Sequence, residues 1–449
     1  MLTRTESTSI FLNTRLVVVG GLAFTVFSLI LIRLLGLDIL GKTLETHMQF
    51  LDIPLLREAP LQSILYTHSQ PPLLNIIAWI LSLLPTDLYT NFMVLNTVCS
   101  YVTGLVIYDI AQYYLVSKPK ALLVTLAYWA SPAAFLYTTY PFYPCLTAIG
   151  YAGLIYSFFI ASRYPSWSLK LIVFSIVYLS LLRSSFTLLH GIFIFVVYYF
   201  YSATKPKLPT LGLALITLVI GLTAVPVKNL ILYEFFGSSS WAPLNVAKGM
   251  GIHDGLGPFP LPEAIRMKYP NLQCAHVYGI QDKEDKRRNG YVNFNSCYLI
   301  EYAKIVKPTL SQNYNYKNHL KIARDSSFIY FSPPEKYPFV ENRVRISAYA
   351  NAYNGLFMSA PVAGTEIRLI LLILLVLTGY FLFKTRDKFI AVLLGIVIVH
   401  FFSHVLVDGG ESSRFVFDIE FIFWIFLAMI MGRTSQPAYE NLVKGADHA

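Results

Sequence analysis

Residues 68–85 read HSQPPLLNIIAWILSLLP, and the length of the apolar run inside this stretch decides the topology of the chain. The run 72–84 has 13 residues, whereas a helix needs roughly 20 apolar residues to cross a bilayer. We therefore interpret it as an interfacial or re-entrant helix that does not cross.

The composition places the rest of the chain in a membrane. The 449 residues are 55% hydrophobic and only 13% charged, with a mean hydropathy of +0.54. A soluble globular protein has roughly 25% charged residues. The composition therefore predicts an integral membrane protein with many helices and excludes a soluble domain with a single anchor.

Ten apolar runs are candidate spans: 16–36, 93–115, 121–138, 143–162, 170–182, 187–202, 210–232, 367–384, 389–407 and 415–432. Basic residues occupy every second short connection: Lys118 and Lys120, Arg163 and Lys170, Lys205 and Lys207, and Lys384, Arg386 and Lys388. Lys and Arg mark cytoplasmic loops. The basic connections are all cytoplasmic only if the run 72–84 does not cross, which puts both termini in the cytoplasm and residues 37–92 outside.

The predicted fold is thus an all-α polytopic membrane protein with about ten transmembrane helices, interfacial helices and one large extracytoplasmic loop. We divide it into a core, 1–232, with a first outer loop at 37–92, a loop subdomain, 233–366, and the C-terminal helices and tail, 367–449. No cleavable signal peptide is expected, because the first apolar run is too long for one. Cys274 and Cys297 both lie in the large loop, where a disulfide between them is an open question.

The net charge of +10 has two interpretations. In a soluble protein it would indicate nucleic-acid binding. Here the basic residues mark topology and contact lipid headgroups, so membrane lipids are expected partners and nucleic acid is not.

The first outer loop contains the first group of candidate site residues. The segment 44–70, LETHMQFLDIPLLREAPLQSILYTHSQ, predicts amphipathic helices on the membrane surface. Asp52 stands there among apolar neighbours and is followed by Glu58, His68 and Gln70. A helix cap or a solvated surface acid is an equally good interpretation of Asp52.

Arginines at the outer ends of spans form a second group. Arg183 lies between two apolar runs, where it must snorkel to a lipid headgroup or bind an anion such as phosphate. Arg414 and Glu411 follow the ninth candidate span on the same side. By charge and side we assign Arg183 and Arg414 as phosphate ligands.

Two histidines lie one helical turn apart near the outer end of the ninth candidate span. His400 and His404 have the i, i+4 spacing of a metal site, but no third ligand is identifiable from the sequence. We therefore favour buried core histidines and predict no metal site. Asp418, in the last span, is expected to pair with Arg414 or another basic residue.

The residues HSQPPLLNIIAWILSLLP (68–85) and the turn SPAAFLYTTYPFYPC (131–145) resemble the integral membrane glycosyltransferases of fold type C. The likeness covers roughly residues 15–200 and is greatest to the protein O-mannosyltransferase and lipid A aminoarabinose transferase branch. It implies that Asp52 is the general base and that His68 and Gln70 approach the donor phosphate. Tyr143 stands where that family usually has a carboxylate, so a divalent metal lacks support and no cofactor is predicted.

The resemblance implies an enzyme that moves a sugar from a polyprenyl-phosphate donor to a hydroxyl acceptor at the extracytoplasmic face. The further candidates for the cleft are Glu58, Tyr143, Trp241, Lys248 and Glu411; Trp241 would serve equally as an interfacial anchor. The alternative is a lipid or small-molecule transporter or flippase without covalent chemistry. That class predicts inverted repeats, and the sequence shows no repeat.

Overall fold

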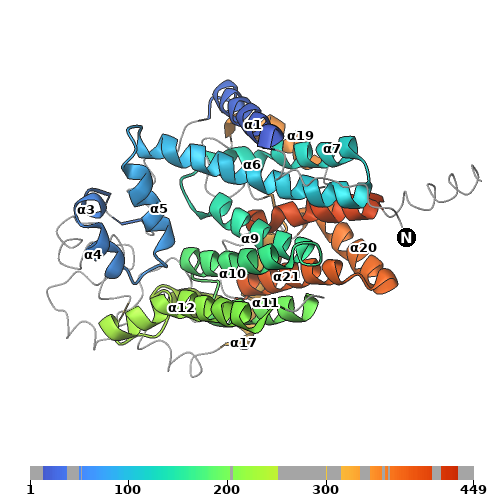
Figure 1. Cartoon of the computed structure of the whole chain (residues 1–449). Helices are drawn as coiled ribbons and strands as arrows, with labels where there is room; N and C mark the ends of the chain where they lie inside the picture. Colours follow the sequence, from blue (N-terminus) through green and yellow to red (C-terminus); the bar gives the residue numbers. More distant parts are fainter. Residues whose placement is uncertain are drawn as a thin grey trace, which may run out of the picture.

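The computed structural model describes residues 14–37, 50–51, 53–202, 206–250, 300, 315–333, 344–355, 359–362, 365–406 and 416–432. Within these ranges the chain is a bundle of helices that run between two ends, from left to right in Figure 1. The helical class predicted from the sequence is confirmed. A short antiparallel pair, β1 (Ser359–Val362) and β2 (Thr365–Arg368), was not predicted.

The helices are, in chain order, α1 (Thr14–Leu34), α3 (Ile53–Glu58), α4 (Pro60–Leu65), α5 (Leu73–Ser82), α6 (Leu88–Leu115), α7 (Lys118–Trp129), α8 (Pro132–Thr138), α9 (Tyr143–Ile160), α10 (Pro165–Leu182), α11 (Leu188–Tyr201), α12 (Leu208–Tyr233), α13 (Ala242–Gly249), α17 (Tyr316–Tyr330), α19 (Ser347–Gly355), α20 (Leu369–Thr385) and α21 (Lys388–Val405). A last helix spans 416–432.

Five of these helices are long and apolar enough to cross a membrane: α6, α9, α10, α12 and α21. The helices α7 and α8 together meet the same criteria but are bent by 56° at the break between them. Shorter apolar helices are Val19–Leu34 within α1, α5, α11 and α20. The chain is therefore an integral membrane protein, and α5, with ten residues, is too short to cross.

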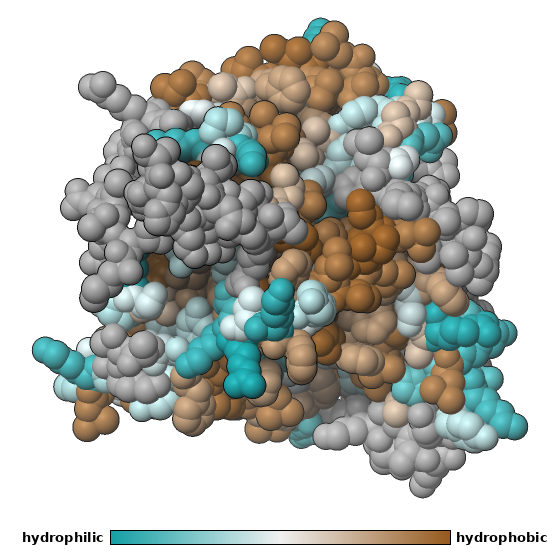
Figure 2. All heavy atoms as spheres, turned by 90° about the vertical axis from the view of Figure 1, so that its right-hand side faces the viewer, coloured by the Kyte–Doolittle hydropathy of each residue, from teal (hydrophilic) through white to brown (hydrophobic). Residues whose placement is uncertain are grey.

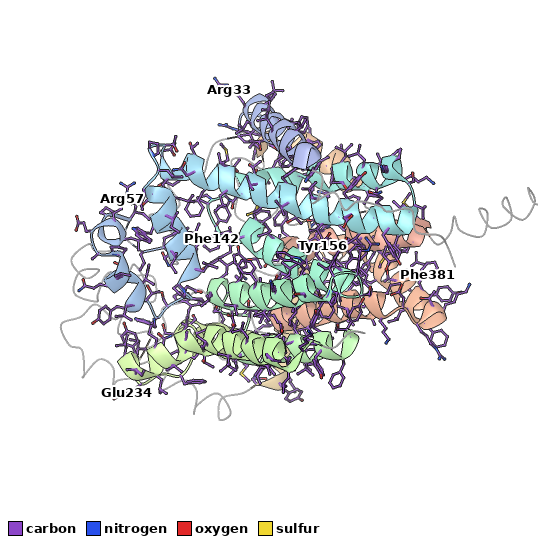
Figure 3. The ribbon with its side chains drawn as sticks, viewed as in Figure 1. Arg33, Arg57, Phe142, Tyr156, Glu234 and Phe381 are labelled. Carbon is purple, nitrogen blue, oxygen red and sulfur yellow. The ribbon has the colours of Figure 1, made fainter. Side chains whose placement is uncertain are left out.

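The two ends of the bundle differ. The short helices α3, α4 and α5 gather at the left end, and the turns that join α6 to α7, α9 to α10 and α20 to α21 lie at the right end (Figure 1). Figure 3 shows Arg57 and Glu234 near the left end and Phe381 near the right end. Seen face on, the right end has separate hydrophilic patches with hydrophobic residues between them (Figure 2).

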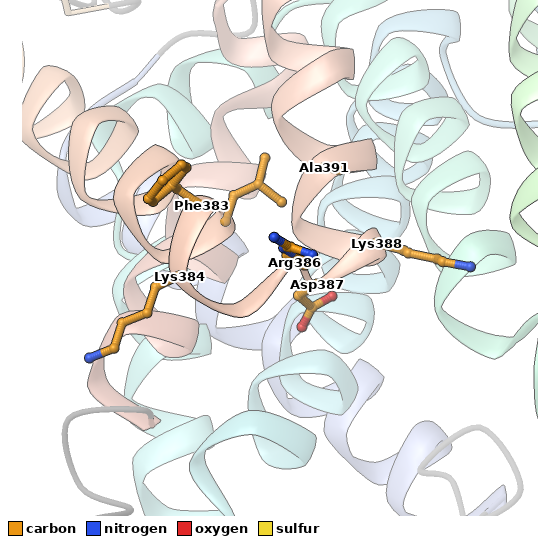
Figure 4. A pocket seen from close by; sticks show the side chains of 7 residues that line it. Phe383, Lys384, Arg386, Asp387, Lys388 and Ala391 are labelled. Carbon is orange, nitrogen blue, oxygen red and sulfur yellow. The ribbon is translucent and has the colours of Figure 1, made fainter.

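The turn between α20 and α21 shows why the chain reverses at the right end. Arg386 has a left-handed backbone (φ 53°) and ends α20, and the Asp387 carboxylate then accepts the Phe389 N–H at 2.9 Å and caps α21. A hollow of about 580 Å³ beside the turn is bordered by Lys384, Arg386 and Lys388 (Figure 4). Such a basic rim suits anionic lipid headgroups.

The last helix, 416–432, forms the centre of the bundle. Almost every side chain from Val416 to Met429 is buried. Its end lies close to α6: a Cβ atom added to Gly432 would lie 2.3 Å from the carbonyl oxygen of Tyr114. A glycine at this contact therefore lets the two helix backbones approach each other.

The described helices of the segment 233–366 lie against the membrane bundle. The helix α19 packs on α8, and the Tyr353 hydroxyl donates to the Ala127 carbonyl oxygen at 2.9 Å. The Tyr349 hydroxyl donates to the carbonyl of Ala130. The helix α17 packs against α21 and buries Tyr330 completely. The described helices of the large loop, α17 and α19, therefore pack against the helices of the membrane bundle.

Candidate functional site

Several predicted site residues fall in the parts of the chain left out of the description. Asp52, Glu411 and Arg414 lie outside the described residues, as do Cys274 and Cys297. Lys248 belongs to α13, but its side chain is also outside the description. The roles assigned to these residues remain predictions, and the site is built below from the others.

The residues just before Asp52 are held firmly at the left end. Phe50 and Leu51 are buried, and the Leu51 N–H donates to the Asn75 side-chain oxygen at 2.8 Å. The Phe50 ring lies 6.3 Å from that of Phe142, in the turn before α9. The chain therefore enters the predicted general-base position from a fixed point beside this turn.

The histidine of the HSQ motif is buried against the segment that follows α12. His68 Nδ1 lies 2.7 Å from the Ser240 hydroxyl, and the Ser240 N–H donates to the His68 carbonyl oxygen at 2.8 Å. The Ser239 hydroxyl donates to the carbonyl of Ser69, and the Tyr233 ring meets that of His68 edge-on at 4.9 Å. The structure thus joins the HSQ motif to the segment with Trp241, two candidates the sequence could not place relative to each other.

The other candidates near the HSQ motif differ in burial. Gln70 is buried, Trp241 is half-buried, and Glu58 is exposed on α3. Lys228, on α12, was missed by the sequence analysis: its Nζ donates to the carbonyl of Thr67, immediately before His68. A lysine near the end of a span is an ordinary topology signal, so no pattern in the sequence singles it out.

Two further candidates, Arg183 and Tyr143, are in contact with each other near Phe50. The Arg183 guanidinium lies over the Tyr143 ring at 5.1 Å from its centroid, and the ring of Phe142 lies 4.4 Å from that of Tyr143. Both Arg183 and Tyr143 are buried. Phe142 connects this pair to Phe50, so the predicted arginine and the neighbours of Asp52 belong to one cluster.

A second group, which we call the polar centre, comprises Tyr151, Tyr330, His400, His404 and Asp418. The imidazoles of His400 and His404 stack with centroids 4.2 Å apart, and His400 Nδ1 lies 2.8 Å from the Tyr330 hydroxyl. The Tyr151 ring meets the His400 ring at 5.4 Å. Four elements therefore meet here: α9, α17, α21 and the last helix.

Asp418 completes the polar centre. One ligand atom from each of His400, His404 and Asp418 lies within 4.8 Å of the other two, and all three residues are buried. The sequence analysis found no third partner for the histidines, and the structure corrects this because the last helix packs beside α21. Asp418 lies beside the two histidines, and its expected partner Arg414 lies outside the described residues, so that pairing stays a prediction.

The electrostatics around Tyr330 follow from its burial. Burial raises the pKa of Tyr330 well above its ordinary value, and the neighbouring acidic groups of Tyr151 and Asp418 raise it further. The Tyr330 hydroxyl is therefore protonated at neutral pH and is a neutral hydrogen-bond partner for His400.

A second buried carboxylate has a different partner. Glu420 accepts a hydrogen bond from Arg368 Nη1 at 2.9 Å, and both side chains are almost fully buried. The sequence analysis did not predict this pairing of Glu420 with Arg368, which lies at the boundary between the large loop and α20.

A cavity of about 270 Å³ adjoins the polar centre. Apolar residues line most of it, among them Phe158, Phe186, Phe193, Ile194, Val197, Val392, Ile396 and Val399, from α9, α11, α21 and the turn before α11. His190, His400 and His404 supply its polar lining together with Ser185 and Ser403. We call it the α11–α21 cavity; an apolar hollow with a few polar groups is typical of a ligand site.

Comparison with known proteins adds no assignment: no family model, curated protein or solved structure matches this chain. The resemblance to glycosyltransferases of fold type C therefore remains a prediction.

Proposed function

We propose that the chain is a membrane glycosyltransferase that takes its sugar from a polyprenyl-phosphate donor and transfers it to a hydroxyl group. The observation that carries the proposal is the α11–α21 cavity, whose walls are apolar and whose polar lining includes His400 and His404. Arg183 lies near the cavity: its carbonyl oxygen accepts the N–H of Phe186 at 3.1 Å, and Phe186 lines the cavity. An apolar slot next to fixed cationic and hydrogen-bonding groups suits a lipid chain with a phosphate at its head.

In this proposal the prenyl chain occupies the cavity and its phosphate lies toward Arg183. Asp52 removes the proton from the acceptor hydroxyl, whose oxygen forms a bond to the anomeric carbon of the sugar. The bond from that carbon to the phosphate oxygen breaks, and the polyprenyl phosphate leaves with its negative charge. General-base catalysis contributes about 10²–10⁴-fold, and stabilisation of the departing phosphate by fixed cations is typically the larger effect.

The residues around the HSQ motif also belong to the proposed site. His68 is fixed by Ser240, and Lys228 donates to the carbonyl that precedes it. This places a half-buried cation and an imidazole beside the segment with Trp241. We assign them to the acceptor or to the donor phosphate, as the resemblance implies for His68 and Gln70.

The proposed topology has ten crossings. The five long helices, the bent pair, α1, α11, α20 and the last helix supply them, and α5 is left out because it is short. The turns with Lys118, Arg163 and Arg386 lie on the cytoplasmic side by the distribution of positive charge. The candidate donor and acceptor groups then lie toward the extracytoplasmic face.

The test is sugar transfer by the purified protein in lipid nanodiscs. Lipids that co-purify with the protein are first identified by mass spectrometry, and the matching polyprenyl-phosphate sugar is then supplied with a labelled sugar. We expect transfer by the wild type and a loss of at least about 100-fold in Asp52→Asn, with donor binding unchanged. Equal rates in the two proteins would remove Asp52 from the mechanism, and absence of any polyprenyl lipid or transfer would reject the proposed function.

The transporter alternative is tested on the same preparation. A fluorescent lipid in proteoliposomes reports movement between leaflets. Rapid movement of lipid phosphate without any sugar transfer would favour the alternative, because a flippase makes no covalent change to its substrate.

A further inference from the structure

We propose that His400, His404 and Asp418 form a binding site for one divalent transition-metal ion of the zinc class. The inference does not rest on glycosyl transfer, because it concerns only what the polar centre binds. Two imidazole nitrogens and one carboxylate oxygen are the ligand set that zinc-class ions accept when further positions are left for water or substrate.

The geometry of the three residues is close to that of a metal site. One ligand atom from each lies within 4.8 Å of the other two. Three ligand atoms at about 2.0–2.2 Å from an ion in tetrahedral geometry lie roughly 3.3–3.6 Å from one another. Side-chain rotations that move the ligand atoms by about an ångström would therefore bring all three to coordination distance. The histidines stand one turn apart on the rigid helix α21, and Asp418 comes from the central helix.

The hydrogen bonds on the outer ring nitrogens select the tautomers that a metal requires. His404 Nδ1 donates to the His400 carbonyl oxygen at 2.9 Å, which leaves Nε2 of the neutral ring with a lone pair. His400 Nδ1 lies 2.8 Å from the Tyr330 hydroxyl, whose oxygen can accept a hydrogen bond from Nδ1–H in the same way. Histidine ligands of metals typically make such a bond with the nitrogen that faces away from the ion.

An atom without a hydrogen-bond partner also indicates a ligand. Nε2 of His400 is buried and makes no hydrogen bond within the described part of the chain, although the residue is only 2% exposed. A buried polar atom left without a partner costs about 1–3 kcal/mol, so a partner is expected. A cation held between His400 and Asp418 satisfies this nitrogen.

The two histidines also line the α11–α21 cavity, which supplies an approach to the ion. Asp418 does not line the cavity, so it contacts the ion from the interior of the bundle. The open coordination positions therefore face the cavity, where an oxygen of a bound lipid or a water molecule can complete the coordination.

The experiment measures metal in the full-length protein purified in nanodiscs, after zinc loading and removal of free ions. We expect about one zinc ion per chain in the wild type and at least a tenfold lower content in His400→Ala, His404→Ala and Asp418→Asn at equal loading. His190→Ala is the matched control: His190 lines the same cavity, but its Nε2 lies 3.3 Å from the Ser403 hydroxyl, so the zinc content is expected to be unchanged.

X-ray absorption on the zinc-loaded wild type tests the ligands directly and does not depend on whether the variants fold. A zinc shell with two imidazole nitrogens supports the site. A wild type that binds no zinc, a shell of oxygens alone, or a zinc content that persists in folded His400→Ala and Asp418→Asn would each overturn the proposal. A loss of zinc in His190→Ala equal to that in the ligand variants would also overturn it.

Discussion

Asp418 and Glu420 are two residues apart on the central helix and are buried to the same extent, but their surroundings differ. Glu420 is 2.9 Å from the guanidinium of Arg368, which carries a permanent positive charge. Asp418 instead faces the imidazoles of His400 and His404. The first carboxylate has a guanidinium beside it, whereas the second lies with two imidazoles, the ligand types of a cation site.

This difference separates a stabilising pair from a binding site. A paired buried charge contributes mainly through what is lost when one partner is removed, because a lone charge remains out of water. In the proposed metal site Asp418 adds to stability through the bound ion, so this contribution depends on the metal concentration in the solution. Substitutions at the two positions should therefore differ in size and in their response to metal.

The largest effect is expected at the ion pair. Glu420→Gln leaves Arg368 buried without an opposite charge, and breaking a buried pair in this way costs about 3–5 kcal/mol. We expect a marked fall in the thermal midpoint in detergent, whether or not zinc or a chelator is present. Thermal unfolding followed by tryptophan fluorescence measures it.

The control for this prediction removes both charges. Arg368→Met combined with Glu420→Leu replaces the pair by apolar side chains, and such replacements are often neutral. We expect the double variant to regain most of the lost stability. A double variant as unstable as Glu420→Gln would show that the pair is not what the single variant disrupts.

The next effect is expected at Asp418 and depends on metal. At a zinc concentration of 100 times the dissociation constant, binding stabilises the folded wild type by about 2.7 kcal/mol. A chelator should therefore lower the thermal midpoint of the wild type, and Asp418→Asn should remove this sensitivity. A chelator response in Asp418→Asn equal to that of the wild type would contradict the contrast between the two carboxylates.

The sequence predicted the bundle because apolar runs and basic connections are local signals. The short run 72–84 corresponds to α5, and the runs 93–115 and 210–232 fall within α6 and α12. The long loop was harder, since the pairing of β1 with β2 and the packing of α19 on α8 are set by contacts that have no period in the sequence.

The polar groups were harder to place for the same reason. The spacing of His400 and His404 is visible in the sequence, but the approach of Asp418 depends on how the last helix packs beside α21. The partners of His68 and Glu420 lie 172 and 52 residues away in the chain. Spacing predicts residues on one helix face, whereas a site built from several helices requires the fold.

A smaller effect is expected from Tyr330→Phe, which tests whether the hydrogen-bond partner of His400 supports metal binding beside Asp418. The substitution removes the hydroxyl beside His400 Nδ1 but keeps the ring. Loss of such a partner typically weakens metal binding about 10–100-fold, which zinc titration measures. Tyr353→Phe is the matched control, because it removes a tyrosine hydroxyl that donates to Ala127 and not to a histidine, and unchanged zinc affinity is expected there.

The smallest effect is expected from Tyr143→Leu, which removes the ring beneath the Arg183 guanidinium and tests whether Arg183 acts independently of the metal ligands. The contact between the Arg183 guanidinium and the Tyr143 ring is worth about 1 kcal/mol, so its loss should weaken binding of the donor lipid by roughly fivefold if the ring positions the arginine. Zinc affinity should not change, because Tyr143 is not a ligand of the proposed ion.

Binding of a fluorescent polyprenyl phosphate measures the affinity for the donor lipid, with Tyr178→Leu, on α10, as a control for loss of an aromatic ring. A donor affinity unchanged in Tyr143→Leu would show that Arg183 keeps its position without the ring, and a fall of zinc affinity would show that the arginine cluster and the metal ligands act as one unit.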